Sequence, residues 1–533
     1  MMILTGHDRI LPLGLAVGNP AAGTGNLTHG VSLPSLMSST LEPSDVDAMR
    51  DRGCTGVLFQ HDFLNPGVSD LPPAAEETLR AAASQGKRLL FFMNPPYGAA
   101  SAGMGEAARA GMTRTSVADR MKAFKMGKAS SQLFSQFIFQ AATLAERYGF
   151  EHHAVAFFGV PTFMTSSSFA SFREFWYPRF SYRGGFLFQA SAFSGVSSTW
   201  AICFTVWEAG DGGTPLIGPG PTLRVLEEGP EGIYTAELKR FCATTPLTSA
   251  SDWARPLVPP GGAKVSPPVL TSGFRVKPGV TKSVPDGFLA YLVNNSNAMY
   301  DSANLSSWGA LPMTPSGFAV LPENWRRAVA LYAARKLVKV TWSTGKDEYQ
   351  APLETLPGYE QWVDDCHVYV LLHGSNCAAA MRGLPGASRV KNHWFWRPRS
   401  SLRALPAGLG RELLADEATE PPCLDVDGRP YGEPYFGYLL ARGKVRLSSD
   451  AAAVLELLDD CWLRSLSLRP GFELHRRATG EQDLHLGAWD AGVYQLRHLF
   501  REHLSDAWAD VLAAHEALAR RLVDGVYRYG FLI

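Results

Sequence analysis

The sequence Asn94-Pro95-Pro96-Tyr97 directly follows the apolar run Arg88 to Met93. These residue types can hold a planar amino group. The amide oxygen of Asn94 and the carbonyl of Pro95 can accept hydrogen bonds from an exocyclic NH2, while Tyr97 stacks on the ring that carries it. Consecutive prolines after a strand are also common in ordinary rigid turns. Taken alone the tetrapeptide favours the turn, so the sequence before it matters.

A glycine-punctuated turn lies about 70 residues upstream, after an apolar stretch at 13–17. Gly23 and Gly25 can adopt backbone angles closed to other residues, and they let a ligand approach the main chain. The spacing predicts a strand, this turn and a helix behind it, which would fit a nucleotide-like cofactor. A Gly-x-Gly turn does not by itself distinguish a dinucleotide site, an S-adenosylmethionine site and no ligand site.

Two acidic residues follow at the ends of predicted strands. Glu42 lies about 20 residues beyond the glycine turn, where nucleotide-binding sheets commonly hold ribose hydroxyls. Asp62 follows the apolar run 57–59, where it can accept a hydrogen bond from an adenine amino group, with Phe63 against the ring. Each acid alone is more simply a helix cap or a turn residue. Their order, each at the carboxyl end of a predicted strand, favours a ligand crevice.

In combination these features resemble the N6-adenine DNA methyltransferases of Type I and Type IIG restriction-modification systems. The likeness covers roughly residues 14–210 and implies a Rossmann-like α/β domain that uses S-adenosylmethionine. By resemblance Glu42 contacts the ribose, Asp62 and Phe63 contact the adenine of the cofactor, and 94–97 is the catalytic motif. The cofactor loop is matched by Asn19, Pro20, Ala21, Gly23 and Gly25.

The resemblance also implies a mechanism. The target adenine leaves the duplex, and its amino nitrogen attacks the methyl group of S-adenosylmethionine in line with the departing sulfur. Asn94 and the Pro95 carbonyl orient the amino group, Tyr97 stacks on one face of the base, and Phe193 contacts the base from the other side or edge. Positioning, rather than a strong general base, carries most of the rate.

The chain departs from the family pattern at two places. Relatives carry a helical segment before the cofactor loop, whereas only about 17 residues precede it here. Either the opening residues 1–12 suffice, or another chain supplies the segment, or the reading frame begins late. In addition, Asn19 stands where many relatives have an acidic residue, and an amide holds a cation less strongly.

Composition limits the class of protein. The 533 residues are 46% hydrophobic, with no uninterrupted apolar run of membrane-spanning length and no signal-peptide pattern, so we expect a soluble, cytoplasmic protein without membrane contact. Seven cysteines, none in Cys-x-x-Cys spacing, argue against a disulfide framework and a zinc module. Cys366 and His367 precede the run Val368 to Leu372, which predicts a buried strand rather than a metal site, and we expect no metal.

Equal numbers of basic and acidic residues, 50 of each, are a poor global signature of nucleic-acid binding. Locally, however, the segment 114–128 has five basic residues and only one acid, Asp119. It is either a solvated surface or a contact to DNA phosphates, and its position after the catalytic motif slightly favours phosphates. The candidate phosphate contacts are Arg114, Lys122, Lys125 and Lys128.

Composition shifts divide the chain into three regions. Residues 1–208 alternate strands and helices and form the predicted catalytic domain. Residues 209–320 read as a linker followed by irregular β structure, a possible target-recognition region. Residues 321–533 are mixed α/β becoming helical, for DNA recognition or partner binding. Helices are predicted at 129–148, 324–339, 449–466 and 494–529.

Aromatic residues are dense in the middle of the chain, from Trp342 to Trp396. Beside arginine and asparagine they could stack on bases, but we favour a core.

The sequence therefore predicts a site-specific DNA adenine methyltransferase that acts on double-stranded DNA in a restriction-modification or phage-defence system. One alternative is a non-catalytic DNA-binding subunit of a defence complex. Another is a methyltransferase for RNA adenine or for a protein glutamine amide. No nuclease signature appears in a convincing strand context, so cleavage would need a partner. Possible partners are a nuclease, a specificity subunit or a subunit that supplies the amino-terminal segment.

Overall fold

The computed structural model describes residues 14–31, 33, 35–65, 71–97, 115–193, 200–210, 213–216, 218–243, 248–256, 270–271, 275–276, 287–293, 297–300, 308–309, 317–378, 392–398, 402, 405, 423–424, 427–472, 486 and 489–532. None of the helices within these ranges combines the length and apolar character that a membrane crossing requires. The chain forms two compact units. The N-terminal unit comprises Met1–Pro246 and Thr341–Asp347, and the C-terminal unit comprises Leu247–Val340 and Glu348–Ile533.

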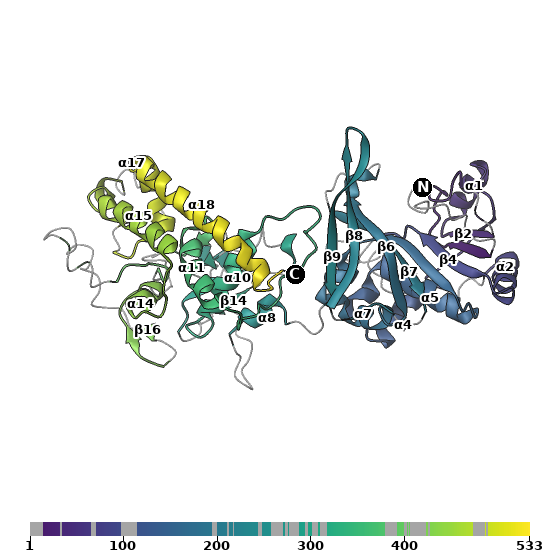
Figure 1. The fold of residues 1–533 in the computed structure, drawn as a ribbon, viewed down its shortest axis with the longest axis horizontal. Coiled ribbons are helices and arrows are strands. Elements are labelled where there is room, and N and C mark those ends of the chain that lie inside the picture. The colour runs from purple at the N-terminus through teal and green to yellow at the C-terminus, as the bar shows by residue number, and fades with distance from the viewer. Residues whose placement is uncertain are drawn as a thin grey trace. The chain divides into compact units, whose positions relative to one another are not determined.

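A mixed sheet of nine strands organises the N-terminal unit (Figure 1), in the order β3-β2-β1-β4-β5-β7-β6-β8-β9. The first five strands are parallel, β7 is antiparallel to β5, and β6 returns to the direction of β5. The strands are β1 Leu15–Asn19, β2 Leu36–Thr40, β3 Val57–Gln60, β4 Arg88–Met93, β5 His153–Gly159, β6 Phe180–Gln189, β7 Ala201–Ala209, β8 Gly218–Gly229 and β9 Gly232–Ala243.

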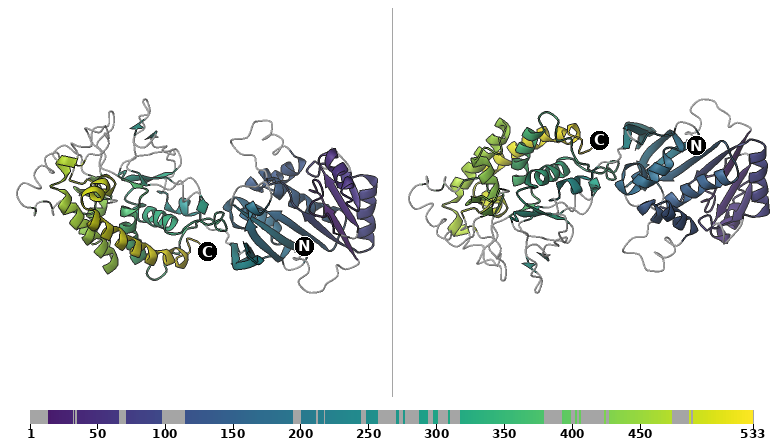
Figure 2. Two further views of the ribbon diagram at one scale, coloured as in Figure 1. Left: turned by 90° about the horizontal axis from the view of Figure 1, so that it is seen from above. Right: turned by 90° about the horizontal axis from the view of Figure 1, so that it is seen from below.

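Helices connect the parallel strands β2, β3, β4 and β5 in sequence, as Figure 2 shows from two sides. Helix α5 buries nearly all of its apolar residues against the sheet in the main core of this unit, and it confirms the helix predicted at 129–148. The helices are α1 Pro43–Asp51, α2 Pro73–Ser84, α4 Ser116–Ala123, α5 Leu133–Arg147, α6 Thr162–Thr165 and α7 Ala170–Trp176, with 3-10 turns η1 Gly127–Ser131, η2 Ser167–Phe169 and η3 Ala190–Ala192.

The helix predicted behind the glycine turn is wrong. Residues 20–30 form successive turns, closed by backbone hydrogen bonds from Gly25 to Ala22 and from Thr28 to Gly25. Gly23, Gly25 and Gly30 all have positive φ, a conformation that does not continue a right-handed helix.

The sheet continues beyond the boundary predicted at 208. Strands β8 and β9 form a long antiparallel hairpin that adds to β6, so the regular sheet runs to Ala243 in a region expected to be irregular. The chain later returns to this unit. Lys239 on β9 donates hydrogen bonds to Asp347 at 2.7 Å and 2.9 Å and to the Ser343 carbonyl at 2.7 Å. The unit is therefore discontinuous in sequence.

The C-terminal unit combines a small sheet of order β14-β12-β13-β15 with several helices. The predicted helices at 324–339 and 449–466 are confirmed, and that at 494–529 is present as two helices. The helices are α8 Ala250–Ala254, α10 Trp325–Leu337, α11 Tyr359–Leu372, α14 Tyr435–Ala441, α15 Ser449–Ser465, α17 Val493–His503 and α18 Ser505–Arg528. The strands are β10 Leu270–Thr271, β11 Arg275–Val276, β12 Ala290–Leu292, β13 Trp308–Gly309, β14 Phe318–Val320, β15 Asn376–Cys377, β16 Cys423–Leu424 and β17 Pro430–Tyr431.

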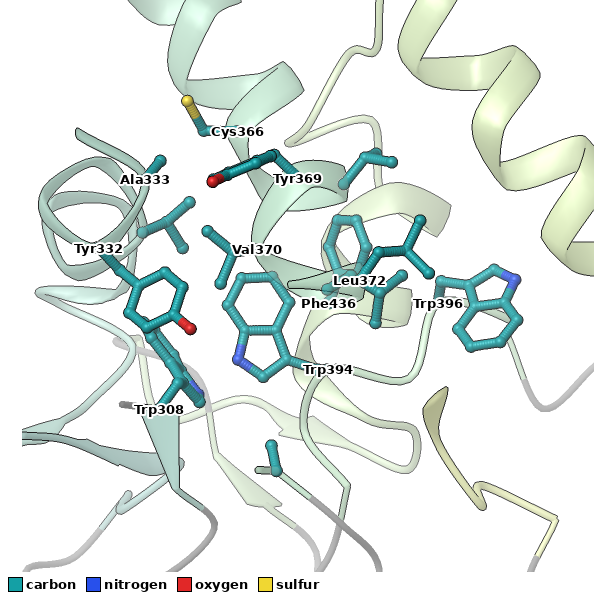
Figure 3. Packing of buried hydrophobic residues seen from close by; sticks show 14 of the residues in the cluster. Trp308, Tyr332, Ala333, Cys366, Tyr369, Val370, Leu372, Trp394, Trp396 and Phe436 are labelled. Atoms are coloured by element: carbon teal, nitrogen blue, oxygen red, sulfur yellow. The ribbon is translucent and has the colours of Figure 1, made fainter. Parts of the chain in front are cut away.

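The aromatic residues of the middle region from Tyr349 to Trp396 lie in the core of this unit, as we favoured, whereas Trp342 packs against the core of the N-terminal unit. Tyr332 of α10 packs with Trp308 and Trp394 (Figure 3), and the ring centroids of Trp308 and Trp394 are 4.8 Å apart. Trp394 and Trp396 are 1% and 3% exposed, so neither indole is available to stack on a base.

The buried strand predicted at Val368 to Leu372 is wrong, because these residues form the last turns of helix α11. When every residue of a short apolar run is buried, its periodicity does not distinguish a strand from a helix. His367 lies within the core, where its Nδ1 hydrogen-bonds the Val363 carbonyl at 2.8 Å. Within the described residues, no three His, Cys, Asp or Glu side chains gather as a metal site would require.

Candidate active site

The predicted site residues converge on one edge of the nine-stranded sheet. Strands β1 and β4 are parallel neighbours with Gly18 opposite Phe91, so their carboxyl ends are nearly level. The chain leaves β1 towards β2 on one side and reaches β4 on the other, which makes the β1–β4 junction a topological switch point. Ligands of open α/β sheets bind in the crevice outside such a point.

Residues 94–97 leave β4 at this edge. Pro95 is buried, Pro96 is exposed, and the side chains of Asn94 and Tyr97 are half-buried. The Tyr97 hydroxyl donates a hydrogen bond to Asn94 Oδ1 at 2.5 Å. Burial raises the pKa of Tyr97 well above its usual value, with a smaller contribution from Cys203, so the hydroxyl keeps its proton.

Trp200 is a site residue that the sequence analysis missed. Its ring centroid lies 5.6 Å from that of Tyr97, and the two rings are nearly perpendicular at 82°. Trp200 directly precedes β7. Because β7 runs antiparallel to β5, with Cys203 opposite Gly159, the amino end of β7 lies at the carboxyl edge of β5. Finding Trp200 from sequence would have required the direction of β7, which no local pattern gives.

Phe193 reaches the same edge from the end of β6, after the short turn η3. Its ring packs edge-on against Phe188 at 5.3 Å and Phe158 at 5.9 Å. Phe158 in turn contacts Phe204, which lies edge-on to Phe92, two residues before Asn94. A continuous row of aromatic rings therefore connects Phe193 with the strand that leads to Asn94.

The glycine turn has the backbone conformation expected of it. Gly23 and Gly25 have φ of 51° and 85°. A Cβ on Gly25 would lie 2.8 Å from Cys54 Sγ and 3.0 Å from Met49 Cγ, whereas a Cβ on Gly23 would meet nothing within 4 Å. Gly25 is thus required for packing against α1, and Gly23 leaves open space. Pro20 and Ala21 lie between β1 and Gly23.

Asn19, the last residue of β1, is only 1% exposed, and neither its amide oxygen nor its amide nitrogen has a hydrogen-bond partner in the described structure. Buried amides without partners are rare in folded proteins. Asn19 also lies beside a cavity of about 40 Å³ that is lined mostly by apolar side chains, among them Phe59 and Leu79. The unpaired amide itself offers one donor group and one acceptor group to a polar ligand.

The two acids differ in what already surrounds them. Glu42 is exposed at the end of β2, where it precedes α1. Asp62 accepts hydrogen bonds from the backbone N–H of Leu64 and Asn65 and from Asn65 Nδ2 at 2.8 Å, and therefore shapes the turn after β3. Phe63 is 5% exposed and stacks on Phe137 with centroids 5.5 Å apart. Its ring belongs to the core, leaving little surface for a cofactor.

The basic segment is only partly described. Lys122, Lys125 and Lys128 are exposed on α4 and the turns that follow it. Lys122 forms a surface ion pair with Asp119 at 2.8 Å. Arg114 lies outside the described residues.

Comparison with known proteins gives distant likenesses alone. No protein-family model matches the chain, and no curated protein does. Among solved structures, the chain is similar to the Type IIL restriction-modification enzyme MmeI in complex with DNA, at 10% identity over 97% of this chain and 70% of MmeI, with a TM-score of 0.38.

Two further similarities cover less of the chain. The DrdV–DNA complex is 16% identical over 40% of this chain and 24% of DrdV, with a TM-score of 0.26. A proposed class I S-adenosylmethionine-dependent methyltransferase from Listeria monocytogenes is 14% identical over 38% of this chain and 56% of its own, with a TM-score of 0.26. The chain thus spans about a quarter of DrdV and about half of the Listeria protein. Likenesses at this level establish no activity.

Proposed function

We propose that the N-terminal unit is an S-adenosylmethionine-dependent methyltransferase that modifies the N6 amino group of adenine in DNA. The observation that carries the proposal is the position of Asn94 to Tyr97 at the end of β4, across the switch point from the glycine turn after β1. The strand order gives further support. Its antiparallel β7 departs from the six parallel strands of dinucleotide-binding sheets, which argues against a dinucleotide as the ligand.

The residues at the edge of the sheet fit the cofactor. The open space at Gly23 admits a ligand next to the main chain, and the buried, unpaired amide of Asn19 offers a donor and an acceptor. Glu42 would accept hydrogen bonds from ribose hydroxyls, and Asp62 would accept one from an adenine amino group. S-adenosylmethionine would supply an electrophilic methyl group on its sulfonium.

The chain's own residues would then orient the acceptor. Asn94 Oδ1 and the Pro95 carbonyl accept hydrogen bonds from the target amino group and draw its lone pair out of conjugation with the ring. Tyr97 stacks on the base, and Phe193 supports it from the side. The base must leave the duplex to reach this site, at a cost of a few kcal/mol. Lys122, Lys125 and Lys128 would hold phosphates, together with Arg114.

An alternative is a DNA-binding subunit without turnover. Asn19 favours it, because an amide in the place of a carboxylate weakens attraction for a cationic cofactor. In either case a nuclease, a specificity subunit or a partner for the amino-terminal side of the cofactor loop could complete the assembly. Methylation of RNA adenine or of a protein glutamine would use the same amino-holding residues.

The experiment is transfer of labelled methyl from S-adenosylmethionine to unmethylated DNA, with RNA as a second acceptor. We expect N6-methyladenine in DNA, and we expect Asn94→Ala to lower the rate at least about a hundredfold, because misplaced reactants cost that much. Gln85→Ala is the matched control, since Gln85 is an exposed amide at the opposite edge of the sheet and should leave the rate unchanged. DNA binding without transfer by the native protein would favour the non-catalytic subunit.

A further inference from the structure

The side chains of Asn94, Tyr97 and Trp200 form a connected set at the end of β4. The Tyr97 hydroxyl lies 2.5 Å from Asn94 Oδ1. The ring of the same tyrosine contacts the Trp200 indole in a nearly perpendicular arrangement. All three side chains are half-buried, so each retains a surface that a ligand can reach. They come from two strands that are far apart in sequence and meet only through the antiparallel placement of β7.

The hydrogen bond occupies the acceptor that the proposed reaction needs. The amino group of a target base would donate to Asn94 Oδ1, which here accepts from Tyr97. Burial raises the pKa of Tyr97, and an amide does not titrate, so this hydrogen bond persists across the working pH range. The amide oxygen has two lone pairs, of which the Tyr97 hydroxyl uses one, so the amino group of the base would compete with this hydroxyl for the orientation of the oxygen.

The indole controls where the tyrosine ring can go. An edge-to-face pair is a preferred aromatic geometry, and this contact restrains the orientation of the Tyr97 ring. A tyrosine held in this way can break the hydrogen bond from its hydroxyl to Asn94 while its ring stays in the pocket. Without the indole the ring would have more orientations, and both the hydrogen bond and the stacking face would be less well defined.

We propose that Trp200 is a positioning residue of the target-base pocket. It holds Tyr97 so that the tyrosine hydroxyl keeps the Asn94 amide oriented until the amino group of the base displaces it. The hydroxyl is thus a placeholder for the substrate amino group, and Trp200 acts on the reaction only through Tyr97. This inference rests on the proposed methyltransferase function.

The test is a set of kcat and KM measurements for methyl transfer to unmethylated DNA. Tyr97→Phe keeps the stacking ring and removes the competing donor, so we expect the KM for DNA to fall about 2- to 10-fold, the effect of one net hydrogen bond. Trp200→Ala should lower kcat about tenfold, and Trp200→Phe should restore most of it. In a Tyr97→Ala background, Trp200→Ala should have no further effect.

A second measurement does not depend on turnover. The protein is labelled with fluorotryptophan, and the Trp200 resonance is assigned by its loss in Trp200→Phe. We expect this resonance to shift in Tyr97→Ala without DNA, and to shift in the native protein when unmethylated DNA is added.

The outcomes separate the inference from the proposed function. If the native protein transfers methyl groups but Tyr97→Phe does not lower KM, or Trp200→Ala still acts without Tyr97, the inference is wrong while the function stands. If the native protein transfers no methyl, the proposed function is wrong. A Trp200 resonance that still responds to DNA then supports a placeholder that opens for a bound base, and an unresponsive resonance overturns it.

Discussion

Two tyrosine hydroxyls in the N-terminal unit differ in whether they have a hydrogen-bond partner, and this difference should affect the free energy of unfolding. Tyr177 is fully buried with no hydrogen-bond partner for its hydroxyl in the described structure, whereas the Tyr182 hydroxyl donates to the Thr222 carbonyl at 2.8 Å. A buried polar group without a partner carries its full desolvation cost. The two residues therefore make a matched pair for mutation.

We predict that Tyr177→Phe raises the free energy of unfolding by about 1 kcal/mol, because it removes an unpaired buried hydroxyl. Tyr182→Phe should lower it by about 1 kcal/mol, because it breaks a hydrogen bond. Urea unfolding at pH 8 measures both. Equal effects of the two substitutions would contradict the prediction.

Tyr177 also gives a pH dependence. Burial raises the pKa of Tyr177 above its usual value of about 10. The unfolded chain therefore loses this proton first, and the stability contribution is present below about pH 10 and lost as the pH rises above it. Between pH 10 and 11 the unfolding free energy of Tyr177→Phe should fall less steeply than that of the native protein.

The sequence predicted those candidate site residues whose chemistry is local. Asn94 to Tyr97 are consecutive, and the positive φ at Gly23 and Gly25 follows from residue type. Trp200 could not be found in this way, because its contact with Tyr97 depends on how β7 enters the sheet. The functional roles of the candidate residues remain predictions.

Helix α11 shows at the level of one element why buried segments are hard to assign. Its predicted strand residues, Val368 to Leu372, are all buried, so no polar side of the helix interrupts the apolar run. The helix at 324–339 was easier, because its apolar positions share related faces. The hairpin of β8 and β9 was missed because the Gly- and Pro-rich stretch before it reads as a linker.

Burial within α11 has a measurable consequence. Burial lowers the pKa of His367 to about 3 and that of His373 to about 4. Below about pH 6.5 these histidines bind protons in the unfolded chain but stay neutral in the folded unit. Their contribution to the free energy of unfolding is therefore complete above that pH and is lost as the pH falls.

We predict that the free energy of unfolding of the C-terminal unit falls, below about pH 6, by about 1.4 kcal/mol per pH unit for each histidine whose pKa is lowered in this way. His367→Phe should make this slope shallower, because His367 is one of three histidines of this unit whose pKa burial lowers, with His373 and His515. A phenylalanine fits the position, since the imidazole ring already stacks on Phe436 with centroids 5.3 Å apart. Urea unfolding followed by tryptophan fluorescence at pH 7, 6 and 5 tests this. An unchanged slope in His367→Phe would show that another group governs acid unfolding.

The glycine turn gives a second prediction for a single element. Gly25→Ala should lower the unfolding free energy by about 2 to 4 kcal/mol, because a Cβ would collide with Cys54 and Met49 in a left-handed conformation. Gly23→Ala, with the same backbone handedness but open space, should cost only about 1 kcal/mol. Thermal unfolding of both variants compares packing with backbone strain. If both variants lose the same free energy of unfolding, α1 must shift to make room for the Cβ at position 25.

For the molecule as a whole, the return of residues 341–347 to the N-terminal unit is the main departure from a chain of consecutive domains. The ion pair between Lys239 and Asp347 at 2.7 Å is mostly shielded, with the two side chains 13% and 25% exposed. Thr165 adds a hydrogen bond to the Lys346 carbonyl at 2.9 Å.

We predict that Lys239→Met lowers the unfolding free energy of the N-terminal unit by about 3 to 5 kcal/mol, because it leaves a shielded carboxylate unpaired. Arg183→Met is the control, since its ion pair with Glu208 is more exposed and should contribute no more than about 1 kcal/mol. The double variant Lys239→Met with Asp347→Asn should recover much of the loss. If it does not, the pairing is incidental to stability.

The return of residues 341–347 to the N-terminal unit also determines the order in which the parts of this unit are synthesised and can assemble. All nine strands of the sheet have been synthesised by residue 243, but the segment that pairs with Lys239 follows roughly a hundred residues later. At about 5 to 20 residues per second, the ribosome needs roughly 5 to 20 seconds to make that interval. During this period the newly formed sheet must wait with part of β9 uncovered, and a chaperone that shields this strand would act in that window.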